Sequence, residues 1–134
     1  MYELKIPARV DRLDDVLEFI GKAVNDAGMD GKFRSNINIA VEEIFVNIAH
    51  YAYPSGEGDV IISASVTPDN LIFELSDSGT PYDPLGKDDP DITLSAEERE
   101  IGGLGIFMVK KLVDDVSYRY EDGKNILTLS KRRS

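Results

Sequence analysis

The sequence predicts an α+β fold, with one mainly antiparallel sheet and amphipathic helices packed on one of its faces. The expected order is strand, helix, helix, strand, strand, acidic segment, helix, strand, strand. Repeated strand–helix–strand crossovers are missing, which disfavours a doubly wound nucleotide-binding fold. The sequence also contains no G-x-x-x-x-G-K-[ST] string, so a P-loop is excluded.

Size and composition narrow the classes of function. The 134 residues, 42% apolar and 30% charged, fit a single domain over 1–134. The absence of cysteine and the single histidine exclude disulfides, cysteine-based metal sites and a thiol nucleophile. A net charge of −10 repels nucleic-acid phosphates, so we expect no nucleic-acid partner. Without a leader-like start or an apolar run near the ~18 residues of a membrane span, we expect a cytoplasmic protein without membrane contact.

The N-terminal segment predicts a short strand and a first helix. Residues 2–6 alternate between polar and apolar and end at Pro7. Apolar residues then recur at helical spacing from Val10 to Val24. Asp11 is expected to cap this helix and Gly28 to end it.

Two hairpins are expected in the second half of the chain. Polar and apolar residues alternate within two segments that flank a turn-forming stretch, Asp59–Val66 and Leu71–Ser76. Val116–Glu121 and Asn125–Leu129 form the closing hairpin, with its turn at Asp122-Gly123.

The second expected helix, Asp30–Tyr53, carries a narrow polar stripe. Its members stand 7, 4 and 3 positions apart and therefore fall on one line: Asn36, Glu43, Asn47 and His50. Apolar side chains border the stripe, and a buried carboxylate without a partner is costly. Asn47 offers an oxygen ligand suited to Mg²⁺, and Glu43, one turn away, is placed for general-base chemistry. The alternative is contact with bulk water or a neighbouring loop, and for His50 packing or a structural hydrogen bond.

A turn rich in small and polar residues, Asp77-Ser78-Gly79-Thr80-Pro81-Tyr82, follows the first hairpin directly. The sheet fixes Asp77, while Gly79 permits a sharp turn or the close approach of a flat ligand. A carboxylate held in this way can accept a hydrogen bond from an exocyclic amine. Such a bond contributes roughly 1.5–3 kcal/mol, which is enough to select adenine over a ring that lacks the donor. A plain strand-ending turn is the alternative.

A glycine cluster, Gly102-Gly103-Leu104-Gly105, precedes the third expected helix. Backbone N–H groups at a helix start converge on anions and can cradle phosphates, although a hinge without a ligand is the alternative. Asp83–Ile101, with seven acidic residues, is expected to be a lid or a disordered tether. The inward residues of the helix are expected to be Ile106, Val109, Leu112 and Val113.

Three motifs, taken in order, resemble the N, G1 and G2 boxes of the GHKL (histidine kinase-like) ATPase superfamily. They are E-x-x-x-N (Glu43 to Asn47), D-x-G (Asp77, Gly79) and G-x-G (Gly103, Gly105). The stretches AVEEIFVNIAHYAYP, DSGTPYDP and GGLGIFMVKKLVDDVSY look most like the anti-sigma factor serine-protein kinases, over essentially the whole chain. The resemblance implies a Bergerat-type two-layer α/β sandwich, its sheet mixed but mainly antiparallel, with three helices on one face.

The resemblance also implies roles for residues. Asn47 would bind Mg²⁺, Glu43 would act as base or orient water, and Asp77 would receive the adenine amino group. The glycines would lie beside the phosphates, under the Asp83–Ile101 lid. The residues expected to bind the nucleotide are Asn47, His50, Asp77, Gly79, Tyr82, Gly103, Leu104 and Gly105.

In this family the kinase uses ATP to phosphorylate a serine of a small STAS-domain anti-anti-sigma protein and sequesters a sigma factor, often as a homodimer. One departure concerns an arginine that some members carry directly before the glycine cluster. Here Ile101 stands there, with Arg99 two positions earlier as the candidate catalytic cation. An ATP-binding module that sequesters a partner without phosphoryl transfer is therefore an alternative, and a domain that has lost nucleotide binding is a third.

Overall fold

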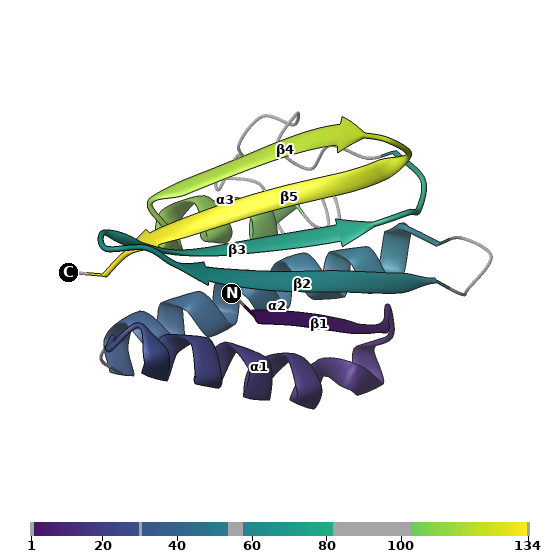
Figure 1. Cartoon of the computed structure of the whole chain (residues 1–134). Coiled ribbons are helices and arrows are strands. Elements are labelled where there is room, and N and C mark those ends of the chain that lie inside the picture. Colours follow the sequence, from purple (N-terminus) through teal and green to yellow (C-terminus); the bar gives the residue numbers. More distant parts are fainter. Residues whose placement is uncertain (1, 30, 54–57, 82–102, 134) are drawn as a thin grey trace.

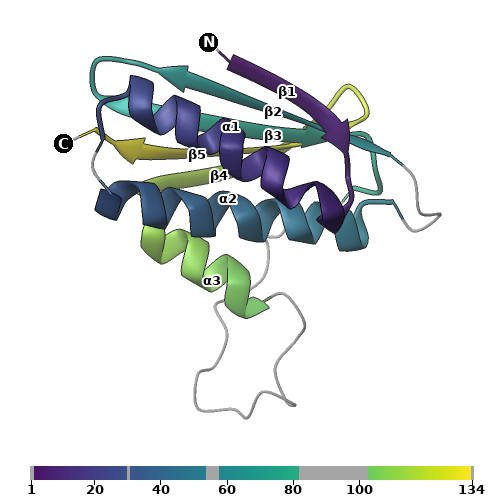
Figure 2. The same cartoon turned by 90° about the horizontal axis from the view of Figure 1, so that it is seen from below.

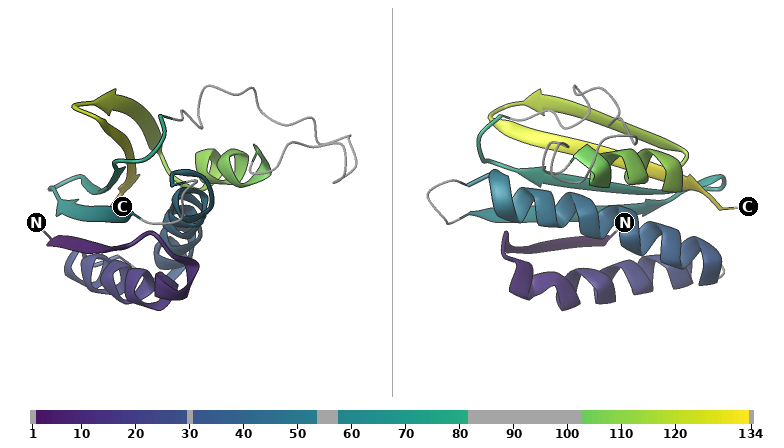
Figure 3. Two further views of the ribbon diagram at one scale, coloured as in Figure 1. Left: turned by 90° about the vertical axis from the view of Figure 1, so that its right-hand side faces the viewer. Right: turned by 180° about the vertical axis from the view of Figure 1, so that it is seen from behind.

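The computed structural model describes residues 2–29, 31–53, 58–81 and 103–133, with side chains of the last stretch from Met108 onward. One five-stranded sheet has the order β1-β2-β3-β5-β4, and each neighbouring pair is antiparallel. Helices α1, α2 and α3 lie on one face of this sheet (Figure 1; Figure 3, left). The predicted α+β fold is confirmed, and pairing among the described strands is antiparallel throughout.

The elements follow the expected order. The strands are β1 (Tyr2–Pro7), β2 (Asp59–Val66), β3 (Asn70–Asp77), β4 (Asp115–Glu121) and β5 (Lys124–Arg132), and the helices are α1 (Leu13–Asp26), α2 (Gly31–Tyr51) and α3 (Gly103–Leu112). Both predicted hairpins are present. The turn at Asp122-Gly123 has positive φ angles of 53° and 77°, as the right-handed twist of a tight hairpin requires.

The core lies between the sheet and the helices. Alternation along β3 turns every second side chain from Leu71 to Asp77 inward, and α2 contributes buried side chains from its middle turns, between Ile37 and Phe45. Burial of one large apolar side chain contributes about 1.5–3 kcal/mol, so this layer dominates stability. The largest fully buried side chains include Phe45, Phe73, Ile20, Ile37, Ile62 and Leu71.

The start of α1 differs from the prediction. Asp11 does not cap the helix; it lies in a short 3₁₀ turn (Val10–Arg12), and α1 has no side-chain cap. Asp11 instead accepts hydrogen bonds from the guanidinium of Arg9, which lower the pKa of its carboxyl group. Val10 is 45% exposed rather than part of the core. Gly28, with φ 69°, follows the end of α1 as predicted.

α3 lies alongside α2, on the side away from α1 (Figure 2). It begins at Gly103, inside the glycine cluster that was expected to precede it. Val109 and Val113 are buried as predicted, Leu112 is half-buried, and the side chain of Ile106 lies outside the described residues, as does Asp83–Ile101. None of the helices that the structure describes is long and apolar enough to cross a membrane.

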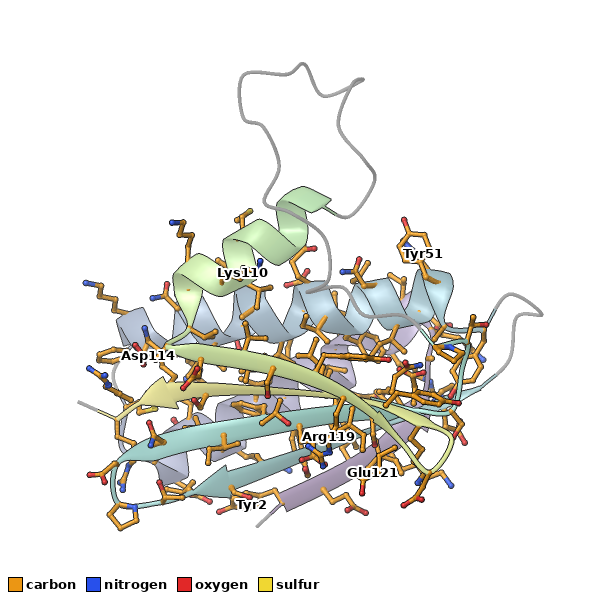
Figure 4. All side chains as sticks on the ribbon, turned by 90° about the horizontal axis from the view of Figure 1, so that it is seen from above. Tyr2, Tyr51, Lys110, Asp114, Arg119 and Glu121 are labelled. Carbon is orange, nitrogen blue, oxygen red and sulfur yellow. The ribbon has the colours of Figure 1, made fainter. Side chains whose placement is uncertain are left out.

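The opposite face of the sheet carries no helix among the described residues. Arg119 and Glu121 project from β4 on this face (Figure 4), and the Arg119 guanidinium lies 3.1 Å from the carboxylate of Glu121 and 3.8 Å from that of Glu74. Such exposed pairs contribute little to stability.

Candidate functional site

A cavity opens between the C-terminal part of α2 and strands β3, β5 and β4. Its volume is about 50 Å³, which is smaller than the range of about 300–1,000 Å³ for small-molecule sites. Its walls are mainly apolar with a few convergent polar groups, a composition typical of such sites. The lining residues are Ile44, Asn47, Ile48, Tyr51, Ala52, Leu75, Asp77, Thr80, Tyr118, Asn125 and Leu127.

Asp77 is the buried carboxylate of this cavity, with 5% of its surface exposed. Its Oδ1 accepts hydrogen bonds from the backbone N–H of Gly79 at 2.9 Å and from Nδ2 of Asn125 at 3.0 Å. Among the described residues no donor meets Oδ2. The second oxygen is therefore available to accept from a ligand, and the first is held in place by the protein.

The turn that follows Asp77 is joined to the end of α2. The backbone N–H of Thr80 donates to the carbonyl oxygen of Ala52 at 2.8 Å. A Cβ at Gly79 would lie 2.1 Å from the same oxygen, so only glycine permits this close approach. The segment that carries Asp77 is thereby fixed against the helix that carries Asn47.

Tyr53 adds a second connection between the two segments. Its hydroxyl donates to the carbonyl oxygen of Asp59 at 2.6 Å and accepts from the backbone N–H of Ser78 at 2.9 Å. Burial is the main cause that raises the pKa of this tyrosine above its ordinary value. The neutral hydroxyl therefore persists at physiological pH and serves as both donor and acceptor.

The polar stripe of α2 reaches the cavity only near the C-terminal end of the helix. Asn47 lines the cavity, whereas half-buried Glu43 lies one turn earlier and is not among the lining residues. Asn36 is half-buried near the start of α2, far from the cavity. His50 is exposed, and its ring meets Tyr51 edge-on at 6.0 Å. Tyr51 is 42% exposed and projects away from the sheet at the end of α2 (Figure 4).

The remaining predicted site residues lie outside the part of the chain whose side chains the structure describes. Gly103, Leu104 and Gly105 lie in the first turn of α3, where only the backbone is described. Tyr82 and Arg99 lie outside the described residues. Their expected roles stay predictions.

Two polar side chains that line the cavity, Asn125 and Tyr118, lie on strands where the sequence predicted no site residue. Asn125 is 7% exposed and begins the inward-facing line of β5 that continues with Leu127 and Leu129. A polar residue on the apolar face of a strand is the signal that marks it. The hydroxyl of Tyr118 donates to Oδ1 of this asparagine.

No group of three or more His, Asp or Glu side chains arranged to hold a metal occurs in the part of the chain that the structure describes. Mg²⁺ commonly binds through one or two protein oxygens, several waters and the phosphates of a nucleotide. The side chain of Asn47, which supplies a neutral amide oxygen at the cavity wall, fits that mode of binding.

The family model of the histidine kinase-like ATPase domain matches residues 6–131. The chain belongs to this family. In the histidine kinase-like ATPase domain of this chain, the three sequence boxes thus fall on α2, the turn after β3 and the start of α3.

Curated relatives of this ATPase domain include serine-protein kinases. The Serine-protein kinase RsbW of Listeria monocytogenes serovar 1/2a is 27% identical over 129 residues, which cover 92% of this chain and 82% of the relative. The protein of the same name from Bacillus cereus (strain AH187) is 26% identical and covers 93% and 81% of the two chains.

Solved structures share the fold. The RsbU and RsbW domains of Rv1364c from Mycobacterium tuberculosis match with a TM-score of 0.64 at 17% identity, over 98% of this chain and 32% of that chain. The histidine kinase domain of the Erythrobacter litoralis EL346 blue-light activated histidine kinase matches with a TM-score of 0.58 at 17% identity, over 90% and 61%.

Proposed function

We propose that the chain is an ATP-dependent serine-protein kinase that phosphorylates a STAS-domain anti-anti-sigma protein and sequesters a sigma factor. The observation that most supports the proposal is that Asp77 and Asn47 line the same mainly apolar cavity. These are the two residues expected to hold the base and the metal of a nucleotide. The serine-protein kinase relatives, matched over more than nine tenths of this chain, support the choice of reaction.

The base of ATP would lie in the apolar part of the cavity. Oδ2 of Asp77 would accept a hydrogen bond from the exocyclic amino group of the adenine base, while apolar side chains such as Ile48 and Leu127 would exclude water. Because the carboxylate is buried, this bond forms where competition from water is weak.

The phosphates would extend along α2 towards the start of α3. Asn47 would hold Mg²⁺ together with the phosphates, and ATP supplies the phosphoryl group that is transferred. The backbone N–H groups at Gly103 and Gly105 would face the phosphates, since the start of a helix favours anions. A net charge of −10 opposes the approach of ATP, so binding should depend strongly on Mg²⁺.

Transfer requires a group that takes the proton of the serine hydroxyl. Glu43, one helical turn before Asn47, would accept that proton or orient the hydroxyl. Arg99 would neutralise charge on the transferred group, and Asp83–Ile101 would cover the site. The domain would act as a homodimer, as is common in the kinases that it resembles.

A second function is favoured by one feature of the sequence. Ile101 stands where some members of the family have an arginine, and without that cation transfer loses much of its charge stabilisation. The alternative is a module that binds ATP and sequesters a protein partner without phosphorylating it.

The experiment that tests the proposal incubates the purified chain with Mg-ATP and each purified STAS-domain protein encoded in the same genome. Phosphoserine is then detected by mass spectrometry. We expect phosphoserine with the wild type, at least 10²-fold less with Glu43→Gln, and nucleotide binding retained by both. Glu42→Gln is the matched control, because this neighbouring glutamate lies off the polar stripe and should keep full activity. ATP and partner binding without phosphoserine would establish the second function instead.

A further inference from the structure

We propose that Asn125, held in place by Tyr118, is a positioning residue that sets which nucleotide base Asp77 accepts. The inference rests on the proposed function, because it concerns the base end of the nucleotide cavity. It assigns a role to a pair of side chains on β4 and β5 that lie outside all three sequence boxes.

Asn125 uses both of its amide protons inside the site. Its Nδ2 donates to Oδ1 of Asp77 at 3.0 Å and to the carbonyl oxygen of Thr80 at 2.9 Å. The contact with Asp77 follows from the sheet register, which pairs these two residues across β3 and β5. One neutral side chain therefore holds both the carboxylate and the turn that follows it.

Tyr118 completes the set of hydrogen bonds around the amide of Asn125. Its hydroxyl donates to Oδ1 of Asn125, so the amide oxygen faces a donor while the amide nitrogen faces two acceptors. The inverted amide would place its oxygen against the oxygens of Asp77 and Thr80, where no hydrogen bond can form. The network therefore selects a single orientation.

This orientation makes the wall of the cavity formed by Asp77 and Tyr118 a set of acceptors. Oδ1 of Asp77 receives two protein donors, from Gly79 and Asn125, which leaves Oδ2 as the oxygen that meets a ligand. The hydroxyl of Tyr118 has given its only proton to Asn125, so towards any further partner it can only accept. A base must therefore present a donor at this wall. The 6-amino group of adenine places a donor directly against the carboxylate, whereas hypoxanthine places its 6-oxo acceptor there and carries its donor one ring position away, at N1.

The test measures the dissociation constants of ATP and of inosine 5′-triphosphate (ITP), each with Mg²⁺, by calorimetry. The two nucleotides differ only at the edge of the base that would face Asp77. We expect the wild type to prefer ATP by roughly 10- to 100-fold, which is the effect of one hydrogen bond to a charged group. Tyr118→Phe removes one hydroxyl and should lower this preference by about 3- to 10-fold. Asn125→Asp puts a second carboxylate against Asp77 and should bring the ratio of the two constants to within about threefold of one.

Tyr120→Phe is the matched control. Tyr120 lies two residues further along β4, opposite Asn125 in the register, but is 50% exposed. Its variant should keep the wild-type preference. Thermal unfolding of each variant without nucleotide shows whether it folds, and Tyr118→Phe tests the inference even if Asn125→Asp does not fold.

The outcomes separate this inference from the proposed function. An unchanged ATP preference in Tyr118→Phe would overturn the inference, and so would an equal loss of affinity for both nucleotides, which is the signature of a purely structural role. Equal binding of ATP and ITP by the wild type would also overturn it and leave ATP binding intact. Failure of the wild type to bind ATP would overturn the proposed function, and the inference with it.

Discussion

The backbone N–H of Thr80 donates to the carbonyl oxygen of Ala52 over 2.8 Å, which joins the turn after β3 to the residue that follows α2. Asp77 and Asn47 lie on the two segments that this bond connects. Their relative position is therefore set by the folded backbone before any ligand arrives. Preorganised polar groups of this kind avoid the cost of reorganisation when a charged ligand binds.

Replacement of Gly79 by alanine should separate those two segments. The new Cβ would lie 2.1 Å from the carbonyl oxygen of Ala52, and a backbone atom cannot move aside cheaply. We expect Gly79→Ala to lower the free energy of unfolding by about 1–3 kcal/mol and to weaken ATP binding, measured by urea denaturation and calorimetry. Gly31→Ala is the control, because a Cβ there meets nothing within 4 Å. A variant that keeps wild-type stability and affinity would show that this contact does not hold the site.

The hydroxyl of Tyr53 should make stability fall at alkaline pH. Burial raises the pKa of Tyr53 in the folded chain above its ordinary value, which is about 10. The contribution of this hydroxyl to the free energy of unfolding is therefore complete below pH about 10, and it is lost as pH rises through the folded-state pKa. Urea denaturation between pH 8 and 11 should show a smaller alkaline loss of stability for Tyr53→Phe than for the wild type. Equal losses would assign the alkaline effect to other tyrosines.

The same substitution should lower stability at neutral pH. Tyr53→Phe removes the hydrogen bonds to the carbonyl of Asp59 and from the N–H of Ser78, and we expect a loss of about 1–2 kcal/mol. Tyr120→Phe, at an exposed position, should change stability by less than about 0.5 kcal/mol.

Arg133 should stabilise the end of the molecule that is remote from the cavity. Its guanidinium donates to the carbonyl oxygen of Ala27 at 3.0 and 2.8 Å and to that of Thr67 at 2.9 Å, joining the end of α1 to the β2–β3 turn. The ammonium group of a lysine cannot donate to both carbonyl groups in the planar, forked arrangement of a guanidinium. Arg133→Lys should therefore lower the free energy of unfolding by about 1–3 kcal/mol and leave ATP affinity unchanged, while Arg132→Lys changes neither. A loss of ATP affinity in Arg133→Lys would contradict the expectation that the contacts of Arg133 do not affect the cavity at the other end of the molecule.

The sequence predicts the order of the elements, and it singles out two of the residues that line the cavity, Asn47 and Asp77. The hairpins follow from alternation and turn chemistry, and the polar stripe of α2 identifies Asn47 because local spacing fixes the face of a helix. The position of Asp77 follows from its place at the end of an apolar strand. These are all properties of contiguous residues.

The rest of the cavity depends on contacts between distant segments. Asn125 meets Asp77 only because β5 pairs with β3 in one register, and a shift by a single residue would turn its side chain to the opposite face. Tyr118 reaches Asn125 through the next pair of strands. The wrong prediction for Asp11 has a different, local cause, because Arg9, only two residues away, holds the carboxylate that was expected to cap α1.

The most direct test of the central claim is calorimetric titration of ATP, with and without Mg²⁺, into the wild type, Asn47→Ala and Asp77→Asn, with Asp59→Asn as the control for loss of an exposed carboxylate. We expect Mg²⁺-dependent binding by the wild type and the control. Asn47→Ala should lose the dependence on Mg²⁺, and Asp77→Asn should bind at least about 10-fold more weakly. Absence of ATP binding by the wild type, or wild-type binding by both site variants, would contradict the account of this cavity as a nucleotide site.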